Sequence, residues 1–210
     1  MTSGRAQLAK LGGGAVAAAL VIALGALALV VFLSANRASA AYTCGDVLLP
    51  PSDSTNVVAP ESLGRDHVAP GSFISYDLCP PTSGSHIGDD AAGPAAPGYH
   101  APSESIGPER WLHNLEHGFV VALYKCALDT CPSPQEQDAL RQFAASVPTS
   151  ANAAACGYRA KVVVARFDQL VTPFALLAWN RTELVDTFDV KLASEFAASY
   201  TDNTAPEIAC

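Results

Sequence analysis

The segment W-L-H-N-L-E-H-G-F-V, residues 111–120, contains two histidines and a glutamate whose spacing suits metal chemistry. On a helix, His113, Glu116 and His117 fall at positions i, i+3 and i+4, so their side chains share one face. A histidine pair separated by four residues can bind one metal ion without distorting the backbone. The spacing H-x-x-E-H also resembles a zinc-peptidase signature, in which the glutamate activates water. Glu116 is therefore the candidate catalytic residue if the chain is an enzyme.

The histidines of this chain cluster in one region, between residues 67 and 117: His67, His86, His100, His113 and His117. A glycine- and proline-rich stretch before the helix could bring His86 or His100 to it, and His67 could fold back from further upstream. Histidine and carboxylate ligands suit Zn(II) or Cu(II). The only methionine is the initiator, so a methionine-rich Cu(I) site is excluded.

A second interpretation of the same histidines needs no metal. His113 and His117 could donate hydrogen bonds to loop carbonyls and hold the segment P-P-T-S-G-S-H, residues 80–86, against the helix. The residue types and their spacing leave the metal site and this bracing role open as alternatives.

The elements that must position these side chains indicate a mixed fold. Pro108 in the first turn and Gly118 after the last favour a short helix over residues 107–117. Apolar runs predict strands over residues 72–78, 119–126, 160–167 and 174–180, and amphipathic patterns predict helices over residues 133–147 and 190–200. This order favours one α+β domain with a small, mainly antiparallel sheet covered by helices.

An uncharged apolar run, residues 11–33, is long enough to cross a bilayer as a helix. Arg5 and Lys10 precede it and only Arg37 follows closely, which favours a cytoplasmic N-terminus. We expect a single-pass protein of the cell membrane with four parts: a cytoplasmic N-terminus (1–10), a transmembrane helix or uncleaved signal anchor (11–34), an extended extracytoplasmic arm (35–70) and an extracytoplasmic α+β domain (71–210).

A cleaved signal peptide is the alternative for this apolar run. The tripeptide A-S-A at residues 38–40 fits a cleavage site, but the run is longer than a usual signal-peptide core. Both interpretations export the domain.

The cysteines agree with export, because all six follow the apolar run: Cys44, Cys79, Cys126, Cys131, Cys156 and Cys210. An even number in an oxidising compartment predicts up to three structural disulfides. Cys126 and Cys131 are close enough to close a short loop, and a bond at Cys210 would fix the C-terminus. The chain has no C-x-x-C motif, so a thioredoxin-type redox site is not expected.

The charge of the chain argues against nucleic-acid partners. Its net charge is −8, and its 12 lysines and arginines are spread thinly, so no basic stripe is available for phosphate contacts. We also expect no nucleotide cofactor. The expected partners are the membrane, through residues 11–34, and a larger membrane protein complex.

Three motifs occur in a fixed order: G-R-D-H-V at residues 64–68, P-P-T-S-G-S-H at 80–86 and L-H-N-L-E-H-G at 112–118, with a weaker A-W-N-R at 178–181. Together they resemble the bacterial domain-of-unknown-function family 3105 over about residues 64–200. The resemblance implies an N-terminal membrane segment, an exported domain and no established activity. It also implies one constellation of five residues: His67, His86, His113, Glu116 and His117.

Three functions follow as hypotheses. The first is a Zn or Cu site with His86, His113 and His117 as ligands, Glu116 as fourth ligand or orienting group, and His67 nearby. The second is a non-catalytic accessory or interaction subunit of a larger membrane complex. The third, a small zinc hydrolase, is weaker because the helix stops at Gly118 and no motif supplies a distant acidic ligand.

Overall fold

The computed structural model describes residues 42–49, 57–127 and 130–208, which belong to one compact unit, Ala41–Cys210. The membrane span predicted for residues 11–34, and the C-terminal Cys210, lie outside the described residues. Across the described ranges, no helix combines the length and the apolar character needed to cross a bilayer.

The centre of the unit is a mixed sheet of six strands in the order β2-β10-β9-β7-β8-β6. Along the chain these strands are β2 (Val57–Val58), β6 (Gly98–Tyr99), β7 (Val120–Tyr124), β8 (Val162–Arg166), β9 (Phe174–Ala178) and β10 (Arg181–Val185). Pairing is antiparallel from β2 to β7 and parallel from β7 to β6. The α+β class is confirmed, but the antiparallel sheet extends only to β7. The connection from β7 to β8 contains two helices, and such a crossover returns the chain in the same direction.

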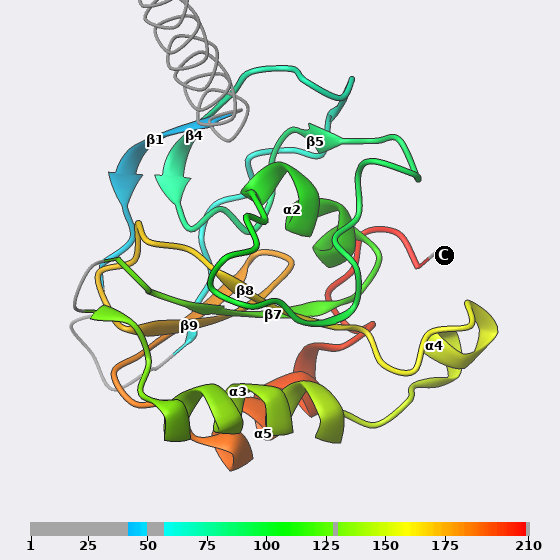
Figure 1. Cartoon of the computed structure of the whole chain (residues 1–210). Helices are drawn as coiled ribbons and strands as arrows, with labels where there is room; N and C mark the ends of the chain where they lie inside the picture. The colour runs from blue at the N-terminus through cyan, green and yellow to red at the C-terminus, as the bar shows by residue number, and fades with distance from the viewer. Residues whose placement is uncertain (1–41, 50–56, 128–129, 209–210) are drawn as a thin grey trace, which may run out of the picture. The chain divides into compact units, whose positions relative to one another are not determined.

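Helices cover both faces of this sheet. They are α2 (Pro108–Glu116), α3 (Pro134–Ser146), α4 (Ala151–Ala155) and α5 (Val190–Tyr200). Figure 1 shows α3 and α5 against one face and α2 on the opposite side. Alternate residues of β7 separate accordingly: Val121 and Leu123 pack in the core beneath α2, whereas Val120 and Ala122 pack against α3 and α5. A strand buried on both faces explains the continuous apolar run in the sequence.

Helix α2, which carries the motif of interest, begins and ends where the sequence predicts. Pro108 occupies its first turn, where a missing amide proton costs no hydrogen bond. Gly118 follows the helix with a φ of 84°, a left-handed conformation that glycine adopts without strain. The helix therefore holds Glu116 in its last turn, directly before β7.

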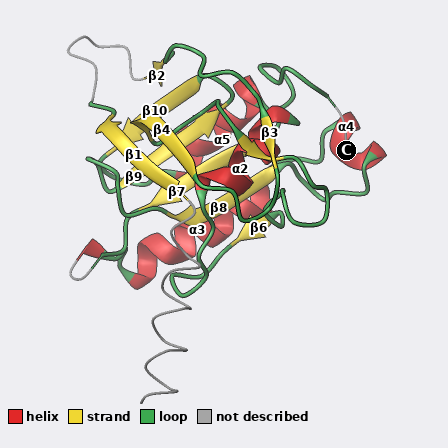
Figure 2. Cartoon of the chain, turned by 90° about the horizontal axis from the view of Figure 1, so that it is seen from above, coloured by secondary structure: helices red, strands yellow, loops and turns green. Residues whose placement is uncertain are grey.

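The described part of the predicted arm supplies strands to the same unit. β1 (Tyr42–Val47) runs parallel to β4 (Ile74–Cys79), as Figure 2 shows, and the Cys44–Cys79 disulfide links the pair. β3 (His67–Val68) pairs in parallel with β5 (His86–Ile87). The arm therefore places His67 directly beside His86.

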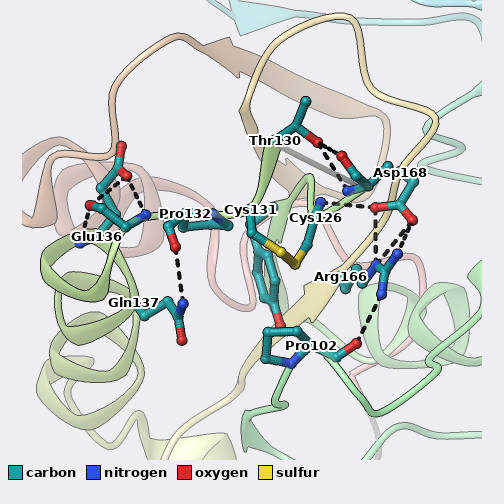
Figure 3. The surroundings of a disulfide bond; sticks show 12 residues. Pro102, Cys126, Thr130, Cys131, Pro132, Glu136, Gln137, Arg166 and Asp168 are labelled. Carbon is teal, nitrogen blue, oxygen red and sulfur yellow. Dashed lines mark hydrogen bonds and ion pairs between the residues drawn. A yellow bond between two sulfur atoms is a disulfide. The ribbon is translucent and has the colours of Figure 1, made fainter.

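A second disulfide, Cys126–Cys131, closes the short loop after β7, as the sequence predicts (Figure 3). The backbone amide of Cys126 donates to Asp168 Oδ1 over 2.8 Å, and the same carboxylate pairs with Arg166. The loop is thus fixed to the end of β8. Both disulfides are consistent with a domain outside the cytoplasm.

Candidate functional site

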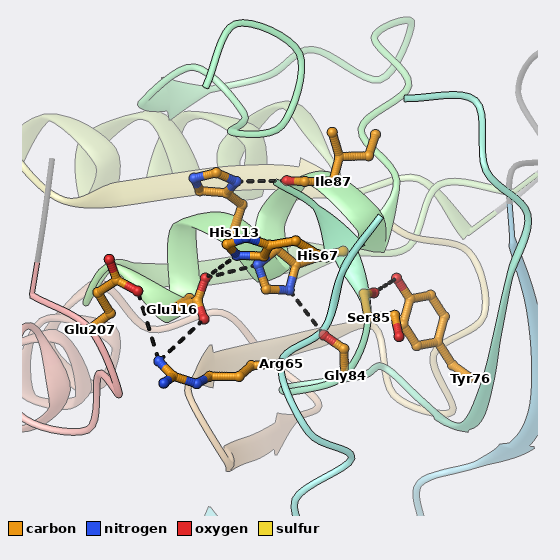
Figure 4. Close-up of polar contacts among 10 residues, drawn as sticks. Arg65, His67, Tyr76, Gly84, Ser85, Ile87, His113, Glu116 and Glu207 are labelled. Carbon is orange, nitrogen blue, oxygen red and sulfur yellow. Dashed lines mark hydrogen bonds and ion pairs between the residues drawn. The ribbon is translucent and has the colours of Figure 1, made fainter. Parts of the chain in front are cut away.

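Three segments far apart in the sequence bring His67, His86 and Glu116 together. In the parallel pair of β3 and β5, His67 lies directly beside His86. Glu116 reaches the pair from the last turn of α2 (Figure 4). The pairing is extended by two backbone hydrogen bonds, from the amide of His86 to Asp66 O over 3.0 Å and from the amide of Gly84 to Gly64 O over 2.7 Å. Regular backbone pairing therefore fixes the separation of the two imidazoles.

Both imidazoles meet the same carboxylate oxygen. His67 Nε2 lies 3.0 Å and His86 Nε2 2.9 Å from Glu116 Oε2. The three potential ligand atoms lie within 4.8 Å of one another. The side chains of His86 and Glu116 are 0% and 1% exposed, whereas that of His67 is 51% exposed. The cluster is therefore enclosed by protein on one side and open to solvent on the side of His67.

The hydrogen bond made by Nδ1 of His86 determines the protonation of its other ring nitrogen, Nε2, which faces Glu116. His86 Nδ1 lies 3.0 Å from the carbonyl oxygen of Gly84, which can only accept, so Nδ1 carries a proton and donates it. In neutral His86, the lone pair of Nε2 then faces Glu116 Oε2. Two lone pairs at this separation repel each other unless a proton or another cation lies between them. The contact is therefore satisfied either by a proton on Nε2, which makes it a hydrogen bond to Glu116, or by a metal ion between the two atoms.

The charge state of Glu116 is compatible with either arrangement. Burial raises the pKa of Glu116, but hydrogen bonds and positive charge from His67 and His86 outweigh it, so the net pKa lies below the usual value. Arg65 Nη1 lies 3.8 Å from Glu116 Oε1 and also 3.8 Å from Glu207 Oε2, with a half-exposed side chain. Glu116 is thus a carboxylate near neutral pH, available to a cation through Oε2.

His113 and His117 lie beside this triad but outside its set of ligand atoms. His113 Nδ1 donates to the carbonyl of Ile87 over 2.7 Å, which agrees with the bracing role. His117 is half-buried, and its Nδ1 has no hydrogen-bond partner among the described residues. Burial lowers the pKa of His117, and the charge of His113 lowers it further. Of the predicted ligands, the structure thus unites His67, His86 and Glu116.

His100 lies apart from the triad. Its Nε2 donates to the carbonyl of Ala96 over 2.8 Å, and its backbone amide donates to Val164 O over 2.8 Å. These contacts fix the loop beside β8. Of the two histidines that the glycine- and proline-rich stretch could supply, His86 is the one beside Glu116.

A buried lysine that sequence reasoning missed fixes the end of α2. Lys161 is fully buried, and its Nζ donates to the carbonyl of His117 over 2.7 Å and to Asp202 Oδ1 over 2.8 Å. A cation at a helix C-terminus stabilises its free carbonyls. Gly118 makes room for this pair, because a Cβ there would stand 2.6 Å from Asp202 Oδ1. The sequence feature that could have identified this lysine is a charged residue near the start of an otherwise apolar strand pattern, A-K-V-V-V-A-R-F.

Comparison with known proteins adds one finding. A family model described as "Protein of unknown function (DUF3105)" matches residues 67–210. The matched range includes His67, His86 and Glu116. None of the curated proteins matches the chain, and none of the solved structures does.

Proposed function

The chain belongs to the DUF3105 family of proteins of unknown function, and we propose that its domain binds a divalent transition-metal ion through His67, His86 and Glu116. Two imidazole nitrogens and a carboxylate oxygen suit Zn(II) or Cu(II). A zinc ion accepts three protein ligands with a fourth position left to water or another ligand. The exposed side of His67 would provide that position.

The contact between His86 and Glu116 is the observation that carries this proposal. A histidine that binds metal through Nε2 commonly donates its Nδ1 proton to a carbonyl or carboxylate, which fixes the ring and its tautomer. Gly84 O accepts that proton here. A metal ion would separate the lone pair of Nε2 from the carboxylate charge, and it would also attract the Nε2 atom of His67.

We further propose that the domain lies outside the cytoplasm and is anchored through residues 11–34. The apolar run and the two disulfides support this location. Protease added to intact spheroplasts should digest the domain, whereas a domain resistant until the cells are lysed would contradict the location.

Metal titration of the full-length chain tests the site. Protein purified in detergent and stripped with EDTA should bind about one equivalent of Zn(II) or Cu(II) by calorimetry and elemental analysis. His67→Gln and Glu116→Gln should each weaken binding about tenfold or more, because each removes a ligand. His117→Gln is the matched control, since His117 directly follows α2 and lies outside the triad, and it should retain binding. A wild-type chain that takes up neither metal would refute the proposal.

Peptide hydrolysis forms no part of this proposal. In an H-x-x-E-H peptidase the two helix histidines bind zinc and leave the glutamate free to activate water. Here Glu116 Oε2 contacts both His67 and His86, and a metal-bound carboxylate is not a free base. If no metal binds, the cluster braces the loop through hydrogen bonds. A non-catalytic interaction subunit would then be tested by co-purification from mild detergent.

A further inference from the structure

A pocket of about 290 Å³ opens at the other end of the loop that carries His86. Its walls come from the arm, from β4 and from the start of the P-P-T-S-G-S-H segment: Pro60, Glu61, Leu63, Asp77, Leu78, Pro80, Pro81, Thr82 and Ser83. None of these residues belongs to the histidine cluster. The volume is at the lower end for a ligand pocket, so it suits a small molecule or a single side chain.

Most of the pocket wall is apolar, formed by three prolines and two leucines. Two hydroxyl residues add polar groups. The Thr82 side chain is almost fully buried, and its Oγ1 has no hydrogen-bond partner among the described residues. Ser83 Oγ accepts from the backbone amide of Leu63 over 2.9 Å and keeps a further lone pair. Because Thr82 Oγ1 is enclosed by protein, the Ser83 hydroxyl is the neutral acceptor that the pocket offers beside its apolar wall.

Two carboxylates, Glu61 and Asp77, give the pocket a negative charge. Both side chains are exposed, and throughout residues 42–49, 57–127 and 130–208 neither makes an ion pair or a side-chain hydrogen bond with another residue. They come from separate segments, the arm and β4. A cation that enters the pocket would therefore meet two unneutralised charges.

We propose that this pocket binds a primary aliphatic ammonium group together with its methylene chain. The methylenes would pack on the prolines and leucines, and the ammonium has three donors on one atom for acceptors that belong to different segments. A planar guanidinium prefers one carboxylate in bidentate contact. A quaternary ammonium prefers an aromatic cage, and no aromatic side chain lines this pocket. Among the described residues, the pocket acids are not part of a group that could hold a metal ion.

Two sources can supply this chemistry, a free diamine or a lysine side chain of another polypeptide. To distinguish them, putrescine and Nα-acetyl-lysine-N-methylamide are titrated separately into the full-length chain. Binding is measured by calorimetry and by NMR shifts of pocket methyl groups. Tighter binding of putrescine would identify a free amine as the ligand, and tighter binding of the lysine amide would identify a polypeptide. Tetramethylammonium, which has the charge without the donors, is the control ligand.

Charge-removing variants locate the site. Glu61→Gln and Asp77→Asn replace exposed side chains by isosteres, so both should fold, and each should weaken binding about threefold to fivefold. Asp90→Asn removes an exposed carboxylate outside the pocket and should leave binding unchanged. The proposal is overturned if neither amine binds, if tetramethylammonium binds equally well, or if Asp90→Asn has the same effect as the pocket variants. None of these readouts depends on metal in the histidine cluster.

Discussion

A Cβ atom on Gly88 would stand 2.5 Å from Cγ of His67, so the glycine backbone lies directly against the imidazole ring. Any side chain at residue 88 must push the ring aside, and the ring is held at Glu116 by a single contact of 3.0 Å. We expect Gly88→Ala to weaken Zn(II) or Cu(II) binding about tenfold or more, as loss of ligand positioning does elsewhere. Metal titration of the stripped full-length variant measures the effect.

Gly71→Ala is the control that distinguishes loss of the contact between Gly88 and His67 from a general effect of replacing a glycine. Gly71 has a φ of 82°, and a Cβ there would meet nothing within 4 Å. The substitution should lower the free energy of unfolding by about 1 kcal/mol through backbone strain and leave metal affinity unchanged. Equal losses of affinity in both variants would show that the Gly88 contact does not position His67.

The fold could be predicted where the pattern is local. The apolar runs gave β7, β8 and β9, and Ser133 with Glu136 forms the capping box that starts α3. The two-residue strands β2, β3, β5 and β6 were not predictable, because they exist only through pairing with distant segments. β10 was missed because its residues R-T-E-L-V are largely polar, although β9 pairs with them throughout.

The sequence grouped five candidate residues but did not predict which three of them, His67, His86 and Glu116, come together. Spacing on a helix groups His113, Glu116 and His117, and that rule holds for any helix. Which of them meets His86 depends on the path of the preceding loop. The carbonyl of Ile87 occupies His113 Nδ1, and the pairing of β3 with β5 brings in His67 instead. Neither contact has a signature in residue spacing.

Glu109 gives the protein a pH dependence with a definite sign. Burial raises the pKa of Glu109, against the opposing effects of its own backbone amide and the Arg110 charge. Between the unfolded pKa of about 4.3 and this raised value, the folded protein keeps a proton that the unfolded chain has lost. Stability therefore falls as pH rises through that window. Glu109→Gln should stabilise the protein at pH 7 by about 1 kcal/mol, the lower end of the cost of an unpaired buried polar group.

Denaturant unfolding of the Glu109 variant and the wild type from about pH 3 to about pH 8, starting below the unfolded pKa, checks this sign. The two curves should converge below about pH 4, where the carboxyl is neutral in both states. Glu195→Gln, on the exposed face of α5, should change stability little at any pH. A gain for Glu109→Gln that is as large at acid pH would contradict the role of the charge.

The buried pair of Lys161 and Asp202 should dominate the stability of the α2 terminus. Lys161→Met leaves Asp202 with Ser150 as its remaining side-chain partner and leaves the carbonyl of His117 without its cation. Removing one member of a buried pair costs about 3–5 kcal/mol. We expect a loss of about 3 kcal/mol for Lys161→Met by denaturant unfolding, and a clearly smaller loss for Arg141→Met, whose ion pair with Asp138 is exposed.

The two described disulfides should differ in their contribution to stability. The Cys44–Cys79 bond spans a sequence separation of 35, whereas the Cys126–Cys131 bond spans only 5. Because a longer closed loop removes more entropy from the unfolded chain, replacing the first pair by alanines should cost about 4 kcal/mol and the second about 2 kcal/mol. Denaturant unfolding of both double variants measures the difference. The longer bond also joins β1 of the arm to β4, so its loss should make the arm more sensitive to limited proteolysis. Equal costs for the two pairs, with an arm as resistant as in the wild type, would show that strand pairing alone holds the arm in place.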